Sequence, residues 1–474
     1  MQKQKNKQKG ITLIALVVTI IALIILAGVS ISMIVEDNGI ITQSRIAKEN
    51  MEDAEIIEKI ELAVTEIQVG DKGYKKLEKD VLEAKLVSYF SEGILKIYDE
   101  KANQYTFYIN NKIYMISTSE VKEIALPEGW NNIEENRNIF GEKEYAYNNP
   151  IIPKGFTPLE TKESSWEVDE GGLPKGWNSG LVIIDESGNE FVWIPCTIQE
   201  IEGAKQVIQY QCYAQDEKFT NYQVDINSLK DMEEYIPVDS EFSQIEKYQG
   251  FYVGRYETGL SENIEKVANK NIENDDTVIN INEEDVIYKG EKVKPVSQYG
   301  KQVWNCVNRD NAAKIAESMI SNEEVKTGLI TGKQWDTMLK WIIEIGGIYD
   351  NSDQADIYYS EKGNFFNSRY DIDGLYAIRD GEIMHWNKGK YSKSKDEMVV
   401  LGTGVHTNSK VNNLYDIYGN VWEITTETDD SGKLIQRGIG ANAGSNKAAG
   451  VHRHGDDKNF GSGEVGFRVV LYIS

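Results

Sequence analysis

Two histidines near the carboxyl end of the chain are of a residue type that can bind a metal ion. His452 and His454 are separated by one residue, and Asp456 follows them. If this segment is a strand, both imidazoles face the same way, because side chains alternate between the two faces of a strand. The spacing matches no standard zinc motif. The pattern therefore favours histidines on an exposed loop over a metal centre.

The same histidines belong to a polar segment, residues 438–463, built largely from Gly, Asn, Ser, Lys, His, Arg and Asp. Loops of this composition on a rigid scaffold form adaptable contact surfaces. We expect this segment to be an exposed binding face for an unknown extracellular protein or glycan. The predicted ligand-binding residues are His452, Arg453, His454 and Asp456.

The cysteine count and the net charge exclude several classes of function. Three cysteines, Cys196, Cys212 and Cys306, cannot form a dense disulfide scaffold. Buried free thiols are the favoured interpretation, and a single bridge stays open. The net charge of −25 argues against nucleic acid as a partner, because a phosphate backbone would be repelled. The same charge suits divalent cation binding.

Hydrophobic periodicity predicts the elements that must position these residues. The chain has 474 residues, which predicts two or three domains. Helical spacing within residues 36–69 is carried by Ile56, Ile57, Ile60, Ala63, Val64 and Ile67. Residues 105–109 and 112–116 read as a hairpin. Further strands are expected at residues 181–184, 191–194 and 251–256, and helices at residues 312–320 and 332–345. Thr331 and Gln334 predict a capping box at the start of the second helix.

An apolar run near the amino terminus has the length of a membrane span. Residues 1–9 carry four lysines and no acid, and residues 11–35 carry no charge. Twenty-five helical residues at about 1.5 Å each span roughly 37 Å, enough for a hydrocarbon core of about 30 Å. The basic head predicts a cytoplasmic amino terminus. We therefore expect a single-pass protein of the cell membrane whose C-terminal domain is extracellular.

The junction Lys9-Gly10-Ile11 resembles the type IV prepilin signal. The resemblance implies cleavage after Gly10 by a prepilin peptidase, methylation of Ile11, and other pilin-like subunits as partners. Ala15 stands where that family carries a glutamate that pairs with a neighbouring subunit. A surface-anchored pilin-like protein is therefore expected rather than a subunit of a long pilus, with a plain membrane anchor as the alternative.

Four blocks of the C-terminal part resemble the formylglycine-generating, sulfatase-modifying enzyme family, and they occur in that family's order. They are residues 251–257, residues 329–335, residues 418–423, and residues 437–438 together with residues 466–470. The resemblance implies a C-type-lectin-like fold with much irregular structure. It does not establish an activity, because one fold supports many functions.

The chemistry of that family is carried over residue by residue. Its copper-dependent oxidase uses two cysteines after the Arg-Gly motif, whereas residues 437–466 of this chain contain none. We therefore expect no copper and no catalytic residues. The family's calcium ion is implied at the side chains of Asp416 and Glu423 and the carbonyls of Gly419 and Val421. The open alternative is that Glu423 pairs with an arginine.

These inferences predict an α+β protein with a transmembrane, pilin-like long helix and small sheet, followed by a loop-rich C-type-lectin-like domain. The expected function is display of a catalytically silent ligand-binding domain. The alternatives are a metal-dependent oxidoreductase and a structural minor pilin subunit. The expected divisions are a leader at residues 1–10, a membrane helix at 11–35, a stalk at 36–125, a linker at 126–178 and the lectin-like domain at 179–474.

Overall fold

The structure is a computed structural model and falls into two compact units, Met1–Ala125 and Leu126–Ser474. It describes residues 40–70, 76–99, 101–109, 112–124, 137–138, 149–159, 179–198, 207–215, 224–238, 241–262, 277–279, 286–288, 291–344, 363–364, 369–372, 376–379, 382–385, 389–392, 399–406, 409–441, 452–457 and 459–473.

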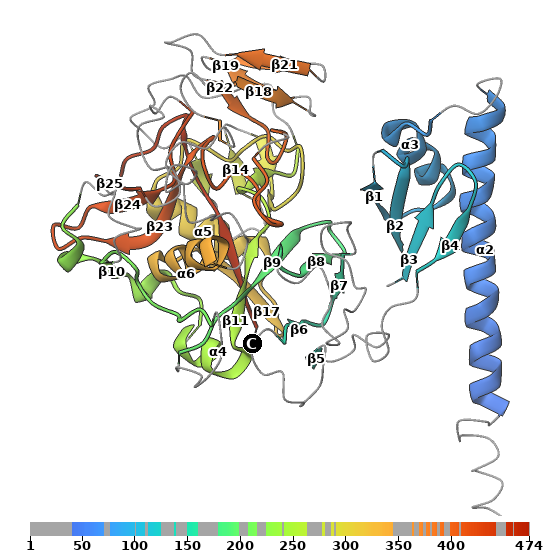
Figure 1. Cartoon of the computed structure of the whole chain (residues 1–474), viewed down its shortest axis with the longest axis horizontal. Coiled ribbons are helices and arrows are strands. Elements are labelled where there is room, and N and C mark those ends of the chain that lie inside the picture. Colours follow the sequence, from blue (N-terminus) through green and yellow to red (C-terminus); the bar gives the residue numbers. More distant parts are fainter. Residues whose placement is uncertain are drawn as a thin grey trace, which may run out of the picture. The chain divides into compact units, whose positions relative to one another are not determined.

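The first unit packs two helices, α2 (Ile40–Gly70) and α3 (Lys79–Tyr89), with a four-stranded antiparallel sheet (Figure 1). The strands are β1 (Ile94–Asp99), β2 (Gln104–Ile109), β3 (Lys112–Ile116) and β4 (Val121–Glu123). The stripe with helical spacing lies on α2, where Ile56, Ile60, Ala63 and Val64 are buried in one core with residues of α3 and the sheet. β2 and β3 form the predicted hairpin.

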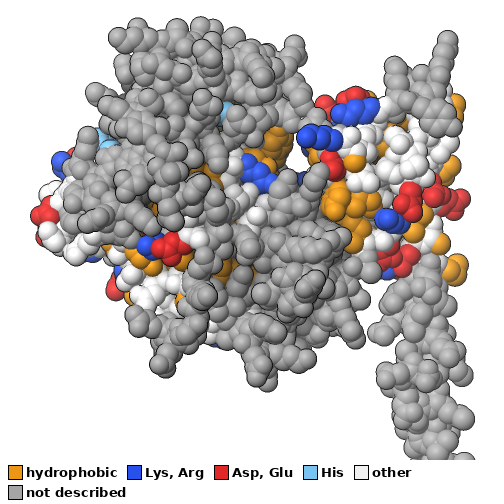
Figure 2. Space-filling model, in the orientation of Figure 1, with side chains coloured by type: hydrophobic (Ala, Val, Ile, Leu, Met, Phe, Trp, Pro, Cys, Tyr) orange, Lys and Arg blue, Asp and Glu red, His pale blue; other side chains and the backbone are white. Residues whose placement is uncertain are grey.

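Charged side chains of the first unit pair at its surface. Lys59 lies 2.8 Å from Glu55 one turn away on α2, and Lys85 of α3 pairs with Glu66 of α2. Figure 2 shows acidic and basic side chains close together over this unit. Exposed pairs of this kind contribute about 0–1 kcal/mol each, so the apolar core carries most of the stability.

The second unit is built around a six-stranded antiparallel sheet in the order β17-β27-β11-β9-β8-β7. Its inner side chains include Trp193 and Tyr252, whose ring centroids lie 4.9 Å apart. β8, β9 and β11 cover the three strands that the sequence predicts. The bounds are β7 (Phe156–Pro158), β8 (Val182–Asp185), β9 (Glu190–Pro195), β11 (Gly250–Gly254), β17 (Val325–Leu329) and β27 (Val469–Ile473).

A second sheet of five strands has the order β10-β23-β24-β25, with β26 parallel to β23. Its strands are β10 (Lys230–Asp231), β23 (Trp422–Thr428), β24 (Leu434–Arg437), β25 (Arg453–Asp456) and β26 (Val465–Phe467). Only Arg468 separates β26 from β27 of the first sheet. The chain therefore crosses from one sheet to the other at a single residue.

Three helices accompany these sheets, namely α4 (Glu241–Tyr248), α5 (Arg309–Met319) and α6 (Gly332–Glu344). The predicted capping box at the start of α6 is confirmed. The amide of Gln334 donates to Thr331 Oγ1 at 3.1 Å, and the amide of Thr331 donates to Gln334 Oε1 at 3.0 Å. This reciprocal pair fixes the direction in which α6 leaves β17. Figure 1 shows α5 and α6 between the two sheets.

Short elements complete the described part of the second unit. They are β5 (Arg137–Asn138), β6 (Ile151–Ile152), η3 (Ile226–Ser228), η4 (Glu233–Tyr235), β12 (Gly259–Leu260), β13 (Thr277–Ile279), β14 (Val286–Tyr288), β15 (Glu291–Val293), β16 (Pro295–Val296), β18 (Arg369–Ile372), β19 (Tyr376–Arg379), β20 (Glu382–His385), β21 (Gly389–Ser392) and β22 (Val399–Leu401).

The fold class predicted from the sequence is wrong, because the described chain is largely β with few helices. The predicted membrane helix is also corrected. Among the helices within the described ranges, none is both long and apolar enough to cross a bilayer. α2 is long, but it carries charges such as Lys48, Glu52 and Lys59. The apolar run at residues 11–35 lies outside the described residues. The single-pass topology and the membrane and pilus partners, which depended on that helix, are therefore not retained.

Replacing Ile60 by Ala should destabilise the first unit by about 2–4 kcal/mol, because the side chain is fully buried and its removal leaves a cavity. Leu62→Ala is the control on the same helix. Leu62 is 45% exposed, and its truncation should cost no more than about 0.5 kcal/mol. Hydrogen–deuterium exchange of the α2 and β2 amides measures both changes. Equal loss of protection in the two variants would contradict this assignment of the core face.

Candidate functional site

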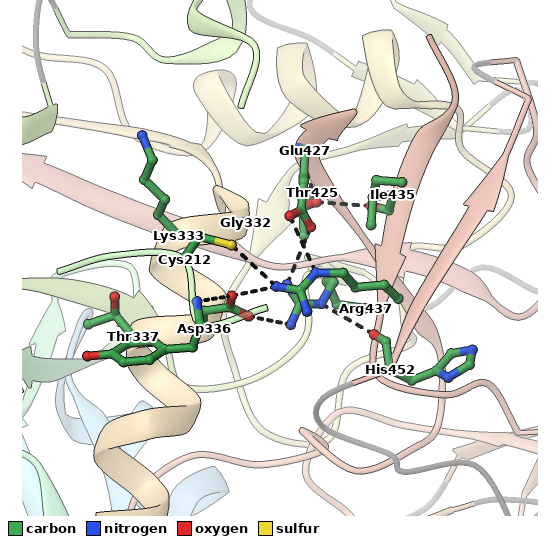
Figure 3. Close-up of polar contacts among 12 residues, drawn as sticks. Cys212, Gly332, Lys333, Asp336, Thr337, Thr425, Glu427, Ile435, Arg437 and His452 are labelled. Carbon is green, nitrogen blue, oxygen red and sulfur yellow. Dashed lines mark hydrogen bonds and ion pairs between the residues drawn. The ribbon is translucent and has the colours of Figure 1, made fainter. Parts of the chain in front are cut away.

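Four charged side chains meet in the interior of the second unit (Figure 3). Asp336 comes from α6, Glu427 from β23, Arg437 from β24 and Arg453 from β25. Arg437 Nη2 donates to Asp336 Oδ1 at 2.6 Å, and Arg453 Nη2 donates to Asp336 Oδ2. Each arginine also lies 3.4 Å from a Glu427 oxygen. Two positive and two negative charges therefore balance inside the protein.

The burial of this network determines its electrostatics. The side chains of Asp336, Arg437 and Arg453 have no exposed surface. Burial alone would raise the pKa of Asp336, but the charges of Arg437 and Arg453 outweigh it and hold that pKa below its usual value. Burial raises the pKa of Glu427, and the negative charges of Asp336 and Asp231 add to the rise. The two arginines, each 3.4 Å away, lower this pKa but do not outweigh these effects. Asp336 is therefore the firmly ionised centre of the network.

A second buried charge pair lies where the chain crosses between the sheets. Arg468 donates to Glu423 through Nε at 3.0 Å and Nη2 at 2.7 Å. Its Nη1 and Nη2 also donate to the carbonyls of Gly254 and Tyr415, at 3.0 and 2.9 Å. The pair thus joins β23, the end of β11 and the junction of β26 with β27.

The Gly-Asn-Val-Trp-Glu motif builds this crossing. A Cβ on Gly419 would lie 2.7 Å from the backbone nitrogen of Asn364. Glycine therefore permits these two segments of the chain to approach closely. Asn420, in the left-handed region with φ +80°, donates to Glu257 at 2.6 Å and accepts from Leu401 N at 2.7 Å. The motif residues therefore hold separate segments together.

The calcium site predicted at Asp416, Gly419, Val421 and Glu423 does not fit this arrangement. Both carboxylate oxygens of Glu423 face Arg468, and Asp416 Oδ2 accepts from the amide of Gly404 at 2.6 Å. Calcium needs six to eight oxygen ligands, and these carboxylates are already engaged. In the part of the chain that the structure describes, no group of three or more His, Cys, Asp or Glu is placed to hold a metal ion. Calcium stays a prediction without support from this geometry.

The residues predicted to contact a ligand lie on or next to a strand, not on an exposed loop. His452 and Arg453 are buried, so the prediction that they are exposed is wrong for both. His454 and Asp456 are partly exposed, at 33% and 26%, and lie 3.3 Å apart. The reason is the alternation of a strand, which turns Arg453 inward and the side chains of His454 and Asp456 to the other face. β25 is also the last strand in the order β10-β23-β24-β25 of its sheet.

An aromatic group supports this outward face. The ring centroid of Trp422 lies 5.3 Å from that of His452 and 5.4 Å from that of His454. The two imidazoles are nearly parallel, with an interplanar angle of 17°. His454 thus packs against Trp422 and His452, and Asp456 contacts His454. Residues 442–451 of the predicted binding segment, and the cleavage residues Gly10 and Ile11, lie outside the described residues.

The three cysteines are free thiols in different settings. Cys196 and Cys306 are buried, as the sequence predicts, but Cys212 is an exposed residue, so the prediction is wrong for it. Its Sγ lies 3.8 Å from Arg453 Nη2 and is partly shielded there. Burial and the charge of Asp336 raise the pKa of Cys212 to about 11. This thiol therefore stays protonated at neutral pH and is a poor nucleophile.

Sequence reasoning missed Asp336 and Glu427 as partners of the two arginines. Asp336 lies among the buried residues of α6 between Trp335 and Thr337. An acid at a position that helical periodicity assigns to the core was the available signal, because a buried charge requires a partner. The identity of that partner could not be read from the sequence, since Arg437 and Arg453 lie far away along the chain.

Comparison with known proteins adds little. No protein-family model and no curated protein matches this chain. Among solved structures, it is similar to Treponema denticola variable protein 1, at 14% identity and a TM-score of 0.19. The match covers 40% of this chain and 61% of that protein, so the chain spans about three fifths of that structure's length. Similarity this low carries no argument about fold or function.

Replacing Asp336 by Asn should destabilise the second unit by about 3–5 kcal/mol, because it leaves two buried arginines without their shared carboxylate. Asp456→Asn, which alters a partly exposed pair, should cost less than about 1 kcal/mol. Urea unfolding followed by tryptophan fluorescence measures both, since all nine tryptophans lie in the second unit. Equal stability of the two variants would show that the network is not intact in solution.

Replacing Glu423 by Gln should lower the melting temperature of the full chain by the same amount in millimolar calcium and in excess chelator. The physical reason is that the loss arises from the unpaired Arg468 guanidinium, not from a lost metal. Differential scanning calorimetry of wild type and variant in both buffers measures the effect. A calcium-dependent rise in melting temperature that is present in wild type and absent in the variant would restore the calcium site.

Proposed function

We propose that the second unit is a catalytically silent ligand-binding domain related to the formylglycine-generating enzyme family. The observation that carries the proposal is the pairing of Arg437 with Arg453 across β24 and β25. These two residues close the polar segment that the sequence marks as a contact surface. Both arginines are held on Asp336, so the part of this segment between Arg437 and Arg453 begins and ends on a buried charge network.

The outward face of β25 offers the contacts that such a domain needs. His454 and Asp456 combine a titratable imidazole with a carboxylate, and the ring of Trp422 lies beside the imidazoles of both His452 and His454. Polar groups placed on an aromatic base provide hydrogen bonds and a flat contact area together. This arrangement favours recognition of a polar ligand.

The chemistry of the site argues against the oxidoreductase alternative. The copper-dependent members of the family use a thiolate pair after the Arg-Gly motif, and residues 437–466 contain no cysteine. Cys212, which lies beside Arg453, is held as a neutral thiol by its raised pKa. A soft metal ion such as Cu(I) requires thiolate ligands. Binding without turnover is therefore the function that these residues suit best.

The double replacement of His454 and Asp456 by Ala should weaken binding while leaving the fold intact, because both side chains are partly exposed. The probes are a printed glycan array and a phage-displayed peptide library, each screened with the purified full chain. We expect any ligand selected by the wild type to bind the double variant at least about tenfold more weakly, a loss of about 1.4 kcal/mol. Surface plasmon resonance measures the affinities, and thermal melts report on the fold.

Glu186→Ala is the matched control, because Glu186 is exposed in the turn between β8 and β9 of the other sheet. This variant should bind as wild type does. Two results would overturn the proposal. One is the absence of any selected ligand from both libraries, and the other is a selected ligand that binds the double variant unchanged.

A further inference from the structure

Glu241, the first residue of α4, is a buried acid with an unsatisfied oxygen. Its side chain lies in the interior, with the residue only 5% exposed. Its Oε2 has no hydrogen-bond partner among the described residues. Burying a polar group without a partner costs about 1–3 kcal/mol in proteins, and more for a charge. An acid that the fold leaves unsatisfied in this way is therefore a candidate ligand for a group from outside.

This acid lines a small pocket between α4, β11, α6 and β27. The interior has room for about one water molecule. Its walls are mainly aromatic and aliphatic, with amide groups from two glutamines. The lining residues are Glu241, Gln244, Ile245, Tyr248, Gly250, Phe251, Tyr252, Gln334, Leu471, Tyr472 and Ile473.

The carboxyl group of Glu241 has neutral hydrogen-bond partners but no ion-paired cation among the described residues. The hydroxyls of Tyr210 and Thr331 hydrogen-bond to it and lower its pKa, while its Oε2 keeps no partner. Asp231 of β10 adds a second negative charge, and its oxygens accept from Gly332 N and Thr426 Oγ1. Lys333 of α6 is the nearby cation, but its Nζ lies over the ring of Phe242, 4.7 Å from the centroid. No ion pair joins Lys333 to Glu241 in the described structure. The phenols of Tyr210 and Tyr472 are neutral at physiological pH, because burial raises the pKa of each.

We propose that this pocket binds one primary ammonium group, which donates to Glu241 Oε2 with aromatic side chains around it. An ammonium head is about the size of a water molecule, so it matches the available room. Tyr248, Phe251, Tyr252 and Tyr472 line the pocket, and aromatic rings attract cations through their negative faces. The net charge of −25 raises the local concentration of cations further.

Other ligand classes fit less well. A divalent metal ion needs several hard oxygen ligands, and only one carboxylate lines this pocket. A guanidinium or a trimethylated amine is larger than the free space. An anion would be repelled by Glu241 and Asp231. The site is therefore distinct in chemistry from the outward face of β25.

The titration of Glu241 gives the expected pH dependence. Burial, followed by the charge of Asp231, raises the pKa of Glu241 from 4.5 to about 7. Between these values the folded chain binds more protons than the unfolded chain, so stability falls as pH rises. Above about pH 7 the carboxylate is ionised, and the folded state then carries the full free-energy cost of burying its charge. An ammonium ligand should therefore stabilise the protein at alkaline pH and have little effect near pH 5.

The test compares methylammonium chloride with tetramethylammonium chloride at equal ionic strength on the full chain. At about pH 8 and about 100 mM, methylammonium should raise the melting temperature by about 2 °C or more above the tetramethylammonium control. Glu241→Gln should remove this difference. The control Glu246→Gln changes an exposed acid on the same helix and should retain it.

The ammonium can come from a free amine or from a lysine of a peptide, and two further probes distinguish these sources. Acetyl-Gly-Lys-Gly-amide and its acetyl-lysine form are titrated by isothermal calorimetry. Binding of the lysine peptide tighter than methylammonium identifies a peptide lysine, whereas binding of methylammonium alone identifies a free amine. Loss of either signal in Glu241→Gln supports the site.

Two results would overturn the proposal. One is an equal effect of the two ammonium salts on the wild type, and the other is a methylammonium effect that survives in Glu241→Gln. The Glu241→Gln variant without added ammonium salt provides an internal check of folding. Glu241→Gln should melt above wild type at about pH 8 and close to it near pH 5, because the amide carries no charge to bury.

Discussion

The bond between Arg468 and Glu423 is the constraint on which the second unit depends. Arg468 is the single residue between β26 and β27, so its backbone carries the chain from one sheet to the other. Its guanidinium binds both oxygens of Glu423 and two carbonyls from other segments. A planar group with five donors suits this task, because it satisfies several acceptors in fixed directions. Loss of either partner would leave an unpaired charge in the interior.

The same kind of buried arginine–carboxylate contact recurs elsewhere in the second unit. Arg255 pairs with Glu190 at 2.6 Å, and Arg437 and Arg453 share Asp336. Buried ion pairs add little net stability compared with apolar packing, but they are costly to break and direction-dependent. In a unit whose strands are short, they fix which described segments lie together. The polar segment between β24 and β25 therefore begins and ends at residues that cannot move apart cheaply.

The sequence predicts the local elements better than it predicts these long-range contacts. Helical spacing identifies the buried stripe of α2, and the pair Thr331 and Gln334 identifies the start of α6. β23 is different, because Trp422–Thr428 mixes Glu and Thr with apolar residues and yet is buried throughout. Its polar side chains are satisfied by residues far along the chain, as Glu423 is by Arg468. Periodicity cannot show such distant partners. For the same reason the sequence predicts Arg453 to be an exposed contact residue, although it is buried.

The unsatisfied oxygen of Glu241 can be compared with the oxygens of the other buried acids in the second unit. Glu257, the acid buried beside Asn420, accepts from that side chain and from the amide of Val421. Glu190, Asp336 and Glu423 each face an arginine. Most buried polar groups in proteins have a hydrogen-bond partner, and these acids follow that rule. Other buried atoms, such as Nε and Nη1 of Arg309, lack a partner among the described residues as Glu241 Oε2 does. Glu241 lies in the same interior and lines a pocket, yet its Oε2 has no partner among the described residues. The raised pKa of Glu241, about 7, removes the cost of a buried charge below that pH, because the carboxyl is then neutral. Above that pH the charge is present, and a donor that enters from solvent would offset its cost, which is the physical basis of the ammonium site that we propose.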